Sequence, residues 1–191
     1  SEGVEKFKRE KFEIIIVDDG STDDSKSIIN HYIDKGLNIQ IVSQKRKGSG
    51  AARNKGLDLS KGKIIYFMDS DDSLTNNTFK ENVTQMESAK SDMHIFGFYS
   101  IYHKKNKKIK IKTANQSNEI ITSNFHFRER FIHLSKNNMN AVWNKFYRKS
   151  FLDANNIRFS SQSTSQDGIF NIEVFKVIEK IVVEHLVFLS N

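Results

Sequence analysis

Three short apolar runs rich in β-branched residues constrain the fold more than any other feature of this chain. They cover residues 12–17 (FEIIIV), 37–42 (LNIQIV) and 63–68 (KIIYFM). Each has the length of a buried strand, and a stretch of helical periodicity lies between one run and the next. Strands that alternate with single helices predict an α/β fold with a doubly wound, mainly parallel sheet.

The predicted helices follow the same alternation. Residues 23–36 and 48–62 each end at a glycine, and a third helix is expected over about residues 75–89. From residue 92 the pattern changes to a long strand, a basic turn and a second strand, which predicts an antiparallel hairpin over residues 92–113. Further helices are expected over residues 125–134 and 166–180, and a last strand over residues 181–190.

The amino-acid composition excludes several kinds of functional site. The 191 residues include no cysteine, which excludes disulfides, a thiol nucleophile and thiolate metal sites. No apolar run reaches the roughly 18–20 residues that span a bilayer, so we expect a cytoplasmic protein. The net charge of +7 suits phosphates, nucleic acid or an anionic membrane. Because no stripe of arginines interleaved with aromatic residues occurs, we expect solvated lysines and no nucleic-acid partner.

Aspartates crowd the end of the third apolar run. Asp69, Asp71 and Asp72 follow it within four positions, where like charges repel and lose solvation. In an extended segment Asp69 and Asp71 project to the same side, and together they suit a hard divalent cation such as Mg²⁺ or Mn²⁺. An EF-hand is excluded because Leu74 and Lys80 replace its glycine and glutamate. The alternative is a capping cluster for the helix that follows.

A second acidic pair ends the first apolar run. Ligands of doubly wound sheets bind beyond the carboxyl ends of the strands, so Asp18 and Asp19 should line the same crevice as the aspartates at residues 69–72. The segment GSGAARNKG has Arg53 where a dinucleotide-binding fingerprint has its third glycine, so it is weak support for that function. Arg53 and the basic residues 45–47 nevertheless bring positive charge that suits a nucleotide diphosphate, unless this is an ordinary surface helix.

Four segments in order resemble glycosyltransferase family 2, the inverting enzymes of GT-A fold. They are FEIIIVDDGSTDDS, GSGAARNKGLDLSKGKIIYFMDSDD, NAVWNKFYRKSFLDANNIRF and SQDGIFN. The resemblance implies a GT-A-like, Rossmann-like three-layer sandwich. It also implies transfer of a sugar from a nucleotide-sugar, most often a UDP-sugar, to a hydroxyl of a glycan or lipid-linked acceptor. The transfer would proceed with inversion, assisted by Mn²⁺ or Mg²⁺, in surface polysaccharide biosynthesis.

The family's nucleotide and metal residues can be placed by motif. By resemblance, Asp19, with Asp18 beside it, holds the nucleoside base, and Arg53 lies on the nucleotide side. Asp69 and Asp71 match the family's D-x-D motif, with Asp69 toward the ribose and the metal and Asp71 as the direct metal ligand.

Two further residues fall on the acceptor side. Asp167 matches the second acid of the family's ED motif and would be the general base; the alternative, which does not conflict with that role, is a helix N-cap. Trp143 would form part of the acceptor wall, or it is plain core beside Phe146 and Phe151. The resemblance assigns residues 1–91 to nucleotide binding and residues 92–191 to the acceptor side of a single domain.

Two departures from the family pattern stand out. The family's usual first strand, which lies between the strands of residues 12–17 and 63–68, is not found upstream of residue 12, and Gln166 replaces the usual glutamate of the ED motif. The first departure leaves activity of this chain open, and the alternative function is a catalytically silent binding or scaffold module. Peripheral association with the inner face of the cell membrane, and an oligomer, are also left open.

Overall fold

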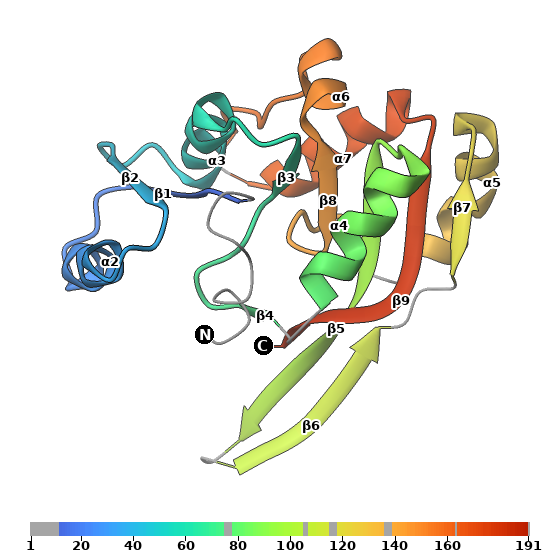
Figure 1. Cartoon of the computed structure of the whole chain (residues 1–191). Coiled ribbons are helices and arrows are strands. Elements are labelled where there is room, and N and C mark those ends of the chain that lie inside the picture. Colours follow the sequence, from blue (N-terminus) through green and yellow to red (C-terminus); the bar gives the residue numbers. More distant parts are fainter. Residues whose placement is uncertain are drawn as a thin grey trace.

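A computed structural model describes residues 12–74, 78–104, 107–114, 118–135, 139–162 and 164–190. The first part of the chain builds a small βαβα unit, as the sequence predicts. Strands β1 (Ile14–Asp18) and β2 (Ile39–Ser43) pair in parallel, and helices α2 (Ser25–Asp34) and α3 (Ser49–Leu59) follow them. Figure 1 shows α3 on the side of this unit that faces β3 and the rest of the molecule.

The remaining strands form a seven-stranded sheet. Its main path runs in the order β3 (Ile64–Tyr66), β8 (Lys145–Arg148), β5 (Met93–Lys104), β9 (Ile181–Ser190) and β4 (Ser73–Leu74). Two more strands lie off this path, because β6 (Lys107–Ala114) pairs with β5 and β7 (Glu119–Ile121) pairs with β9. Strand β9 confirms the last strand predicted from the sequence, over residues 181–190. The short strands β4, β7 and β8 were not predicted.

Strand direction corrects the expectation of a mainly parallel sheet. Strand β8 is antiparallel to both of its neighbours, β3 and β5, and β5 is parallel to β9. Strands β3, β5 and β9 therefore run in one direction, with β8 inserted as a reversed strand. The strands β4, β6 and β7 are also antiparallel to their partners, so the sheet is mixed. Strand β8 runs in the same direction as β7, which precedes it across α5 (Asn124–Ser135), because each is antiparallel to one member of the parallel pair β5 and β9.

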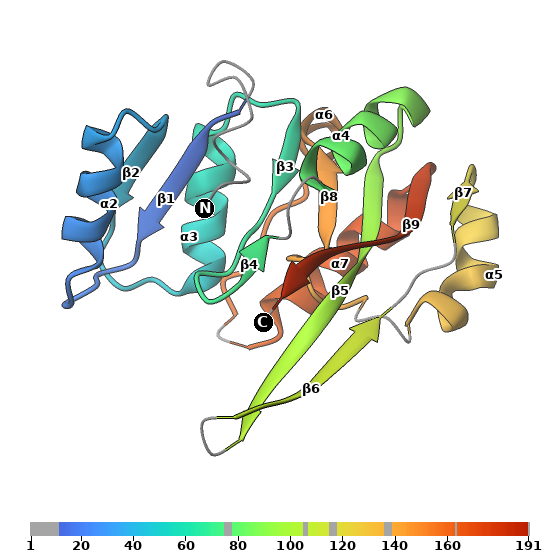
Figure 2. The ribbon, with the colours of Figure 1, turned by 60° about the horizontal axis from the view of Figure 1, so that its bottom comes forward.

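The two sheets remain separate in the part of the chain that the structure describes. Strand β1 pairs with β2, strand β3 pairs with β8, and no described strand joins β1 to β3. Helix α3 packs against β1 instead, and Figure 2 shows it behind the space that separates β1 from β3. The relation between the two halves thus depends on α3.

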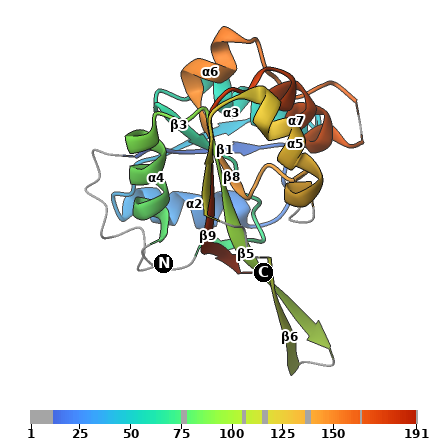
Figure 3. The same ribbon diagram turned by 90° about the vertical axis from the view of Figure 1, so that its right-hand side faces the viewer.

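Helices cover both faces of the larger sheet, which gives the three layers expected. Figure 3 shows α4 (Thr78–Ala89) on one face and α5 (Asn124–Ser135) and α7 (Gln166–Val177) on the other. The short helix α6 (Lys149–Ala154) follows β8. No helix among the described residues is long and apolar enough to cross a bilayer.

The hairpin predicted over residues 92–113 is present. Strands β5 and β6 pair in antiparallel register from Phe98 opposite Ala114 to Lys104 opposite Lys107, with an irregularity after Tyr102. Figure 1 shows this hairpin extending away from the body of the molecule. The turn at residues 105–106 and the start of the helix predicted from residue 75 lie outside the described residues.

An aromatic cluster lies under the candidate site. Phe159 and Phe170 stack with ring centroids 4.2 Å apart, and Phe67 meets both rings edge-on. Tyr147 packs edge-on against Phe170 at 5.4 Å. These rings join α7, β8 and the loop at residues 157–160, so they fix the height of α7 above the sheet.

Truncating this cluster should destabilise the whole fold. Phe170 is fully buried, and we expect Phe170→Ala to lower the free energy of unfolding in urea by about 3–5 kcal/mol. Ile132→Ala on α5 is the matched control, because the Ile132 side chain is 78% exposed. Equal unfolding midpoints for the two variants would contradict the assigned core.

Candidate functional site

The first turn of α3 is the point at which the candidate residues meet. It begins after Gly48, whose φ of +90° favours glycine. The Asp19 carboxylate accepts hydrogen bonds from the backbone N–H groups of Lys47 and Gly48, both at 2.8 Å. It also accepts one from the Gln44 side chain at 2.8 Å. Asp19 therefore ties the end of β1 to the loop that enters α3.

These bonds stabilise the charged form of Asp19. Donation from the Gln44 amide has the largest effect in lowering the pKa of Asp19, followed by the Lys47 backbone N–H. Asp19 is thus a fixed anion at the carboxyl end of β1. Its neighbour Asp18 is buried and serves the turn itself.

Asp18 closes the turn after β1. Its carboxylate accepts a hydrogen bond from the Ser21 backbone N–H at 2.8 Å and forms an ion pair with Lys26 at 3.1 Å. The hydrogen bonds from Ser21 lower the pKa of Asp18 most strongly, and Lys26 adds to the effect. Asp18 and Asp19 therefore point to different partners, one toward α2 and the other toward α3.

Arg53 connects two predicted site residues from distant parts of the chain. Its guanidinium donates to Asp167 Oδ1 at 2.7 Å and to Asp69 Oδ1 at 2.8 Å. The Arg53 side chain is 18% exposed, so water screens these pairs less than at an open surface. The guanidinium also lies 5.4 Å from the ring centre of Phe159. The predicted nucleotide-side arginine, D-x-D aspartate and base are thus in one place.

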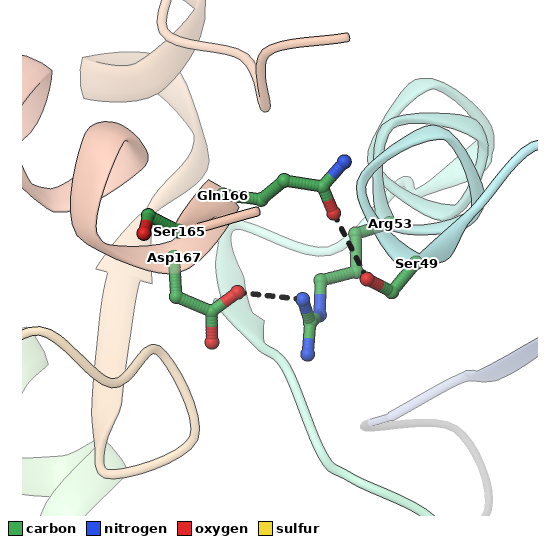
Figure 4. Close-up of a pocket in the computed structure, with 5 residues that line it drawn as sticks. All are labelled: Ser49, Arg53, Ser165, Gln166 and Asp167. Carbon is green, nitrogen blue, oxygen red and sulfur yellow. Dashed lines mark hydrogen bonds and ion pairs between the residues drawn. The ribbon is translucent and has the colours of Figure 1, made fainter. Parts of the chain in front are cut away.

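A small pocket opens beside this ion-pair bridge. It has a volume of about 260 Å³ and is lined by Ser49, Arg53, Ser165, Gln166 and Asp167. Figure 4 shows the Asp167 carboxylate directed toward Arg53 and the Gln166 amide directed toward Ser49. The pocket therefore lies between the first turns of α3 and α7.

Asp167 is the candidate acid with a raised pKa. Partial burial raises the pKa of this carboxyl, the Arg53 guanidinium opposes the rise, and the negative charge of Asp69 adds to it. The Val142 backbone hydrogen bond and the charge of Lys145 also favour the ionised form. Raised pKa values cluster at catalytic carboxyls that must exchange a proton.

A buried polar network, which the sequence analysis missed, supports the turn that carries Asp167. The Asn171 side-chain amide donates to the backbone carbonyls of Asn140 at 2.9 Å, Ala141 at 3.1 Å and Asp167 at 3.1 Å. The Tyr147 hydroxyl donates to Asn171 Oδ1 at 2.8 Å. This network fixes the first turn of α7 against the loop before β8.

Lys145 extends the same network. It is fully buried, and its ammonium donates to the Ala141 carbonyl at 2.5 Å and to Asn144 Oδ1 at 2.7 Å. Burial lowers the pKa of Lys145 to about 7, although the nearby Asp167 opposes this shift. The signal available in the sequence was the pair Asn144–Lys145 at a position where polar residues interrupt an apolar run.

A reciprocal pair anchors α3 to the same region. The Asn54 amide donates to the Phe159 carbonyl at 2.9 Å and its oxygen accepts the Phe159 N–H at 2.8 Å. These two hydrogen bonds set the position of α3 along the loop at residues 157–160. Arg53, which precedes Asn54, therefore lies beside the stacked rings of Phe159 and Phe170. Sequence reasoning missed Asn54 because its partner lies 105 positions away.

The remaining candidates lie further from the bridge. Asp71 is exposed, whereas Asp72 is buried. No group of three or more His, Cys, Asp or Glu side chains able to hold a metal occurs among the described residues. Residues 70–71 form a turn, in which the Asp72 N–H donates to the Asp69 carbonyl at 3.2 Å, and not the extended segment expected from the sequence. The alternation of an extended strand therefore does not place Asp69 and Asp71 on the same side. Trp143 is partly buried and packs edge-on against Phe98 at 4.8 Å, as part of a hydrophobic cluster.

Comparison with solved structures supports the fold. A crystal structure of residues 1–349 of S. aureus TarS matches 97% of this chain and 52% of its own length, with a TM-score of 0.78 and 22% identity. The same TarS fragment solved in complex with UDP-GlcNAc matches with a TM-score of 0.77. These glycosyltransferase structures confirm the GT-A-like α/β fold class predicted from the sequence.

Comparison with curated sequences gives glycosyltransferases. The cholesterol galactosyltransferase of Borreliella burgdorferi is 28% identical over 190 residues, which cover 94% of this chain and 51% of that protein. The glycosyltransferase EpsJ of Bacillus subtilis is 26% identical over 171 residues, covering 88% of this chain and 49% of its own. This chain thus spans about half the length of these relatives.

A family model decides the assignment. The model described as glycosyl transferase family 2 matches residues 2–155, which is most of the chain. The fold and the model agree with the resemblance, and this chain belongs to glycosyltransferase family 2.

Proposed function

We propose that this chain transfers a sugar from a nucleotide-sugar donor, in the first instance a UDP-sugar, to a hydroxyl group of a glycan or lipid-linked acceptor. The observation that carries this proposal is the Arg53 bridge, which brings Asp69 and Asp167 together beside a pocket. Family membership supports a transferase, and the UDP-GlcNAc complex of TarS supports the donor class. Surface polysaccharide assembly is the proposed context, in line with the poly(ribitol-phosphate) β-glucosyltransferase of Bacillus spizizenii, which is 27% identical over 178 residues.

Sugar transfer requires positive charge on the leaving-group side of the anomeric carbon and a proton acceptor on the opposite side. Loss of a nucleotide diphosphate puts negative charge on the leaving oxygens, which cationic groups stabilise. Arg53 would serve that side together with a divalent ion held by Asp69 and Asp71. The ion would act as a Lewis acid toward the diphosphate. Asp167 would accept the proton of the attacking hydroxyl, so that in-line attack inverts the anomeric configuration.

Asp167 is suited to the base role by its surroundings. It has to be held in place and to bind a proton more strongly than an exposed aspartate does. Asn171 holds its turn, and partial burial raises its pKa. Arg53 keeps the carboxylate ionised before the donor arrives. When the diphosphate draws the guanidinium away, Asp167 becomes a stronger base.

Removing the carboxylate should remove most of the activity. We expect Asp167→Asn to lower kcat for sugar transfer by about 10²–10⁴-fold, because general-base catalysis is lost while the side chain keeps its shape. Asp34→Asn on α2 is the matched control at an exposed position. Transfer at the wild-type rate by the Asp167 variant, measured with radiolabelled UDP-sugars, would rule out the base assignment.

The pH profile provides a second check. A base must be deprotonated, so kcat/KM should fall as the pH drops through the pKa of Asp167. Because this pKa is raised above the usual 3.8, the acid limb should lie above that value. Arg53→Met removes the positive charge that lowers the pKa of Asp167. We therefore expect the acid limb to move to higher pH in that variant. A limb that stays in place or moves to lower pH would argue against Asp167.

The metal proposal has its own test. If Asp71 is a ligand of Mn²⁺ or Mg²⁺, Asp71→Asn should abolish metal-stimulated transfer and weaken the binding of UDP with Mn²⁺, as measured by calorimetry. The Asp34→Asn variant should bind UDP and Mn²⁺ as the wild type does. Unchanged metal stimulation in the Asp71 variant would exclude this aspartate as a ligand.

A further inference from the structure

Gln166, the first residue of α7, reaches across the pocket to α3. Its Oε1 atom accepts a hydrogen bond from the Gly50 backbone N–H at 2.8 Å and another from the Ser49 hydroxyl at 2.9 Å. The backbone N–H groups of a first helical turn have no partner within their own helix. A side chain from a segment 116 positions away therefore provides a partner at the start of α3.

The other end of the same amide holds the loop before α7. Its Nε2 atom donates to the backbone carbonyl of Gln162 and, at 3.5 Å, to that of Ser160. One side chain thus accepts from α3 and donates to the loop at residues 160–162. A glutamate could accept the first set of bonds, but its ionised carboxylate has no hydrogen to donate. A glutamine at this position can make both sets of bonds at once.

Gly50 provides the space for this contact. A Cβ atom at Gly50 would lie 2.8 Å from both Cδ and Nε2 of Gln166, which is closer than such atoms approach. Gly50 is buried and has an ordinary helical conformation, so conformational freedom does not require a glycine there. A Cβ at Gly50 would therefore displace the amide of Gln166, which is the end of a flexible side chain.

We propose that Gln166 is a positioning residue that holds Asp167 against Arg53 by fastening the first turn of α7 to the first turn of α3. Asp167 is the next residue on α7, and Arg53 lies three positions after Gly50 on the same side of α3. The inference rests on the proposed roles of Asp167 and Arg53. It adds a residue that acts on the reaction through them.

The anchors of α3 predict which step this contact affects. Asp19 holds the loop that enters α3 through the Lys47 and Gly48 N–H groups, and these bonds do not involve Gln166. Asn54 holds the helix independently at Phe159. Loss of the Gln166 contact should therefore leave the nucleotide side in place and displace mainly the base. The expected result is a fall in kcat with little change in the affinity for UDP.

Two variants break the contact from opposite sides. Gln166→Leu removes the polar atoms, and Gly50→Ala adds a Cβ that pushes the flexible amide away. Because a misplaced catalytic group costs roughly 10²-fold per ångström, we expect kcat to fall about 10- to 100-fold in each variant. The double variant should be no slower than the slower single variant, because both changes remove the same contact. Gln166→Glu keeps the acceptor and should recover part of the loss.

Matched controls exist on the same elements. Gln162→Leu changes an exposed side chain of the same loop, and Gly56→Ala adds a Cβ to α3 where it meets only Val17 Cγ2, at 3.7 Å. Both should keep wild-type kcat. Independent losses that multiply in the Gly50→Ala, Gln166→Leu double variant would overturn the inference. So would an unchanged kcat in the Gln166→Leu variant of an active chain.

A measurement that does not require sugar transfer can test this inference separately from the proposed function. Hydrogen exchange of the Gly50 amide, followed by NMR, should be faster in the Gln166→Leu variant than in the wild type and in the Gln162→Leu control. Unchanged protection of that amide would overturn the contact whatever the activity. The two ideas can also fail separately. If the wild-type chain transfers no sugar, but the Gly50 amide loses protection in the Gln166→Leu variant, the proposed function is wrong and the contact between the helices is supported.

Discussion

The double ion pair of Arg53 is the interaction on which the candidate site depends. Asp69 belongs to the turn after β3 and Asp167 to the first turn of α7, and both carry negative charge in a partly buried place. Without a cation between them these carboxylates would repel each other and lose solvation. The guanidinium suits the task, because its planar fork can donate to two carboxylates at once. Arg53 therefore offsets the charge of both carboxylates and holds the turn after β3 and the first turn of α7 together.

This arrangement has a consequence for how an anionic ligand would enter. Under the proposed function, a diphosphate would compete with the two aspartates for Arg53, and a divalent ion would take the place of the guanidinium at Asp69. Binding would thus exchange one set of charge pairs for another rather than create a site anew. Asp167, released from the guanidinium, would then face the acceptor with a higher proton affinity. In that proposal the Arg53 bridge would limit the proton affinity of Asp167 until a donor binds.

Helix α3 gives this bridge its mechanical support. It packs on β1, the N–H groups of Gly48 and Gly50 at its start donate to Asp19 and Gln166, and Asn54 fastens it to the loop at residues 157–160. Since no described strand joins the two sheets, these polar contacts carry much of the connection between the halves. Side-chain hydrogen bonds specify a register that apolar packing would leave loose. The site lies at the junction of the halves, where such contacts are concentrated.

The sequence by itself determined the fold class, most of the long elements and the family, because apolar periodicity and short motifs are local properties. It also identified the acids and the arginine that could do the chemistry. Only the tertiary structure decided the reversed strand β8, the division of labour between Asp18 and Asp19, and the roles of Gln166, Asn171 and Lys145. Most of these features depend on partners far away in the sequence, whereas the hydrogen bonds of Asp18 and Lys145 are local and become visible only once the chain has folded. A hydrogen bond between residues 116 positions apart, such as that of Gln166 with Gly50, leaves no periodic trace in either segment.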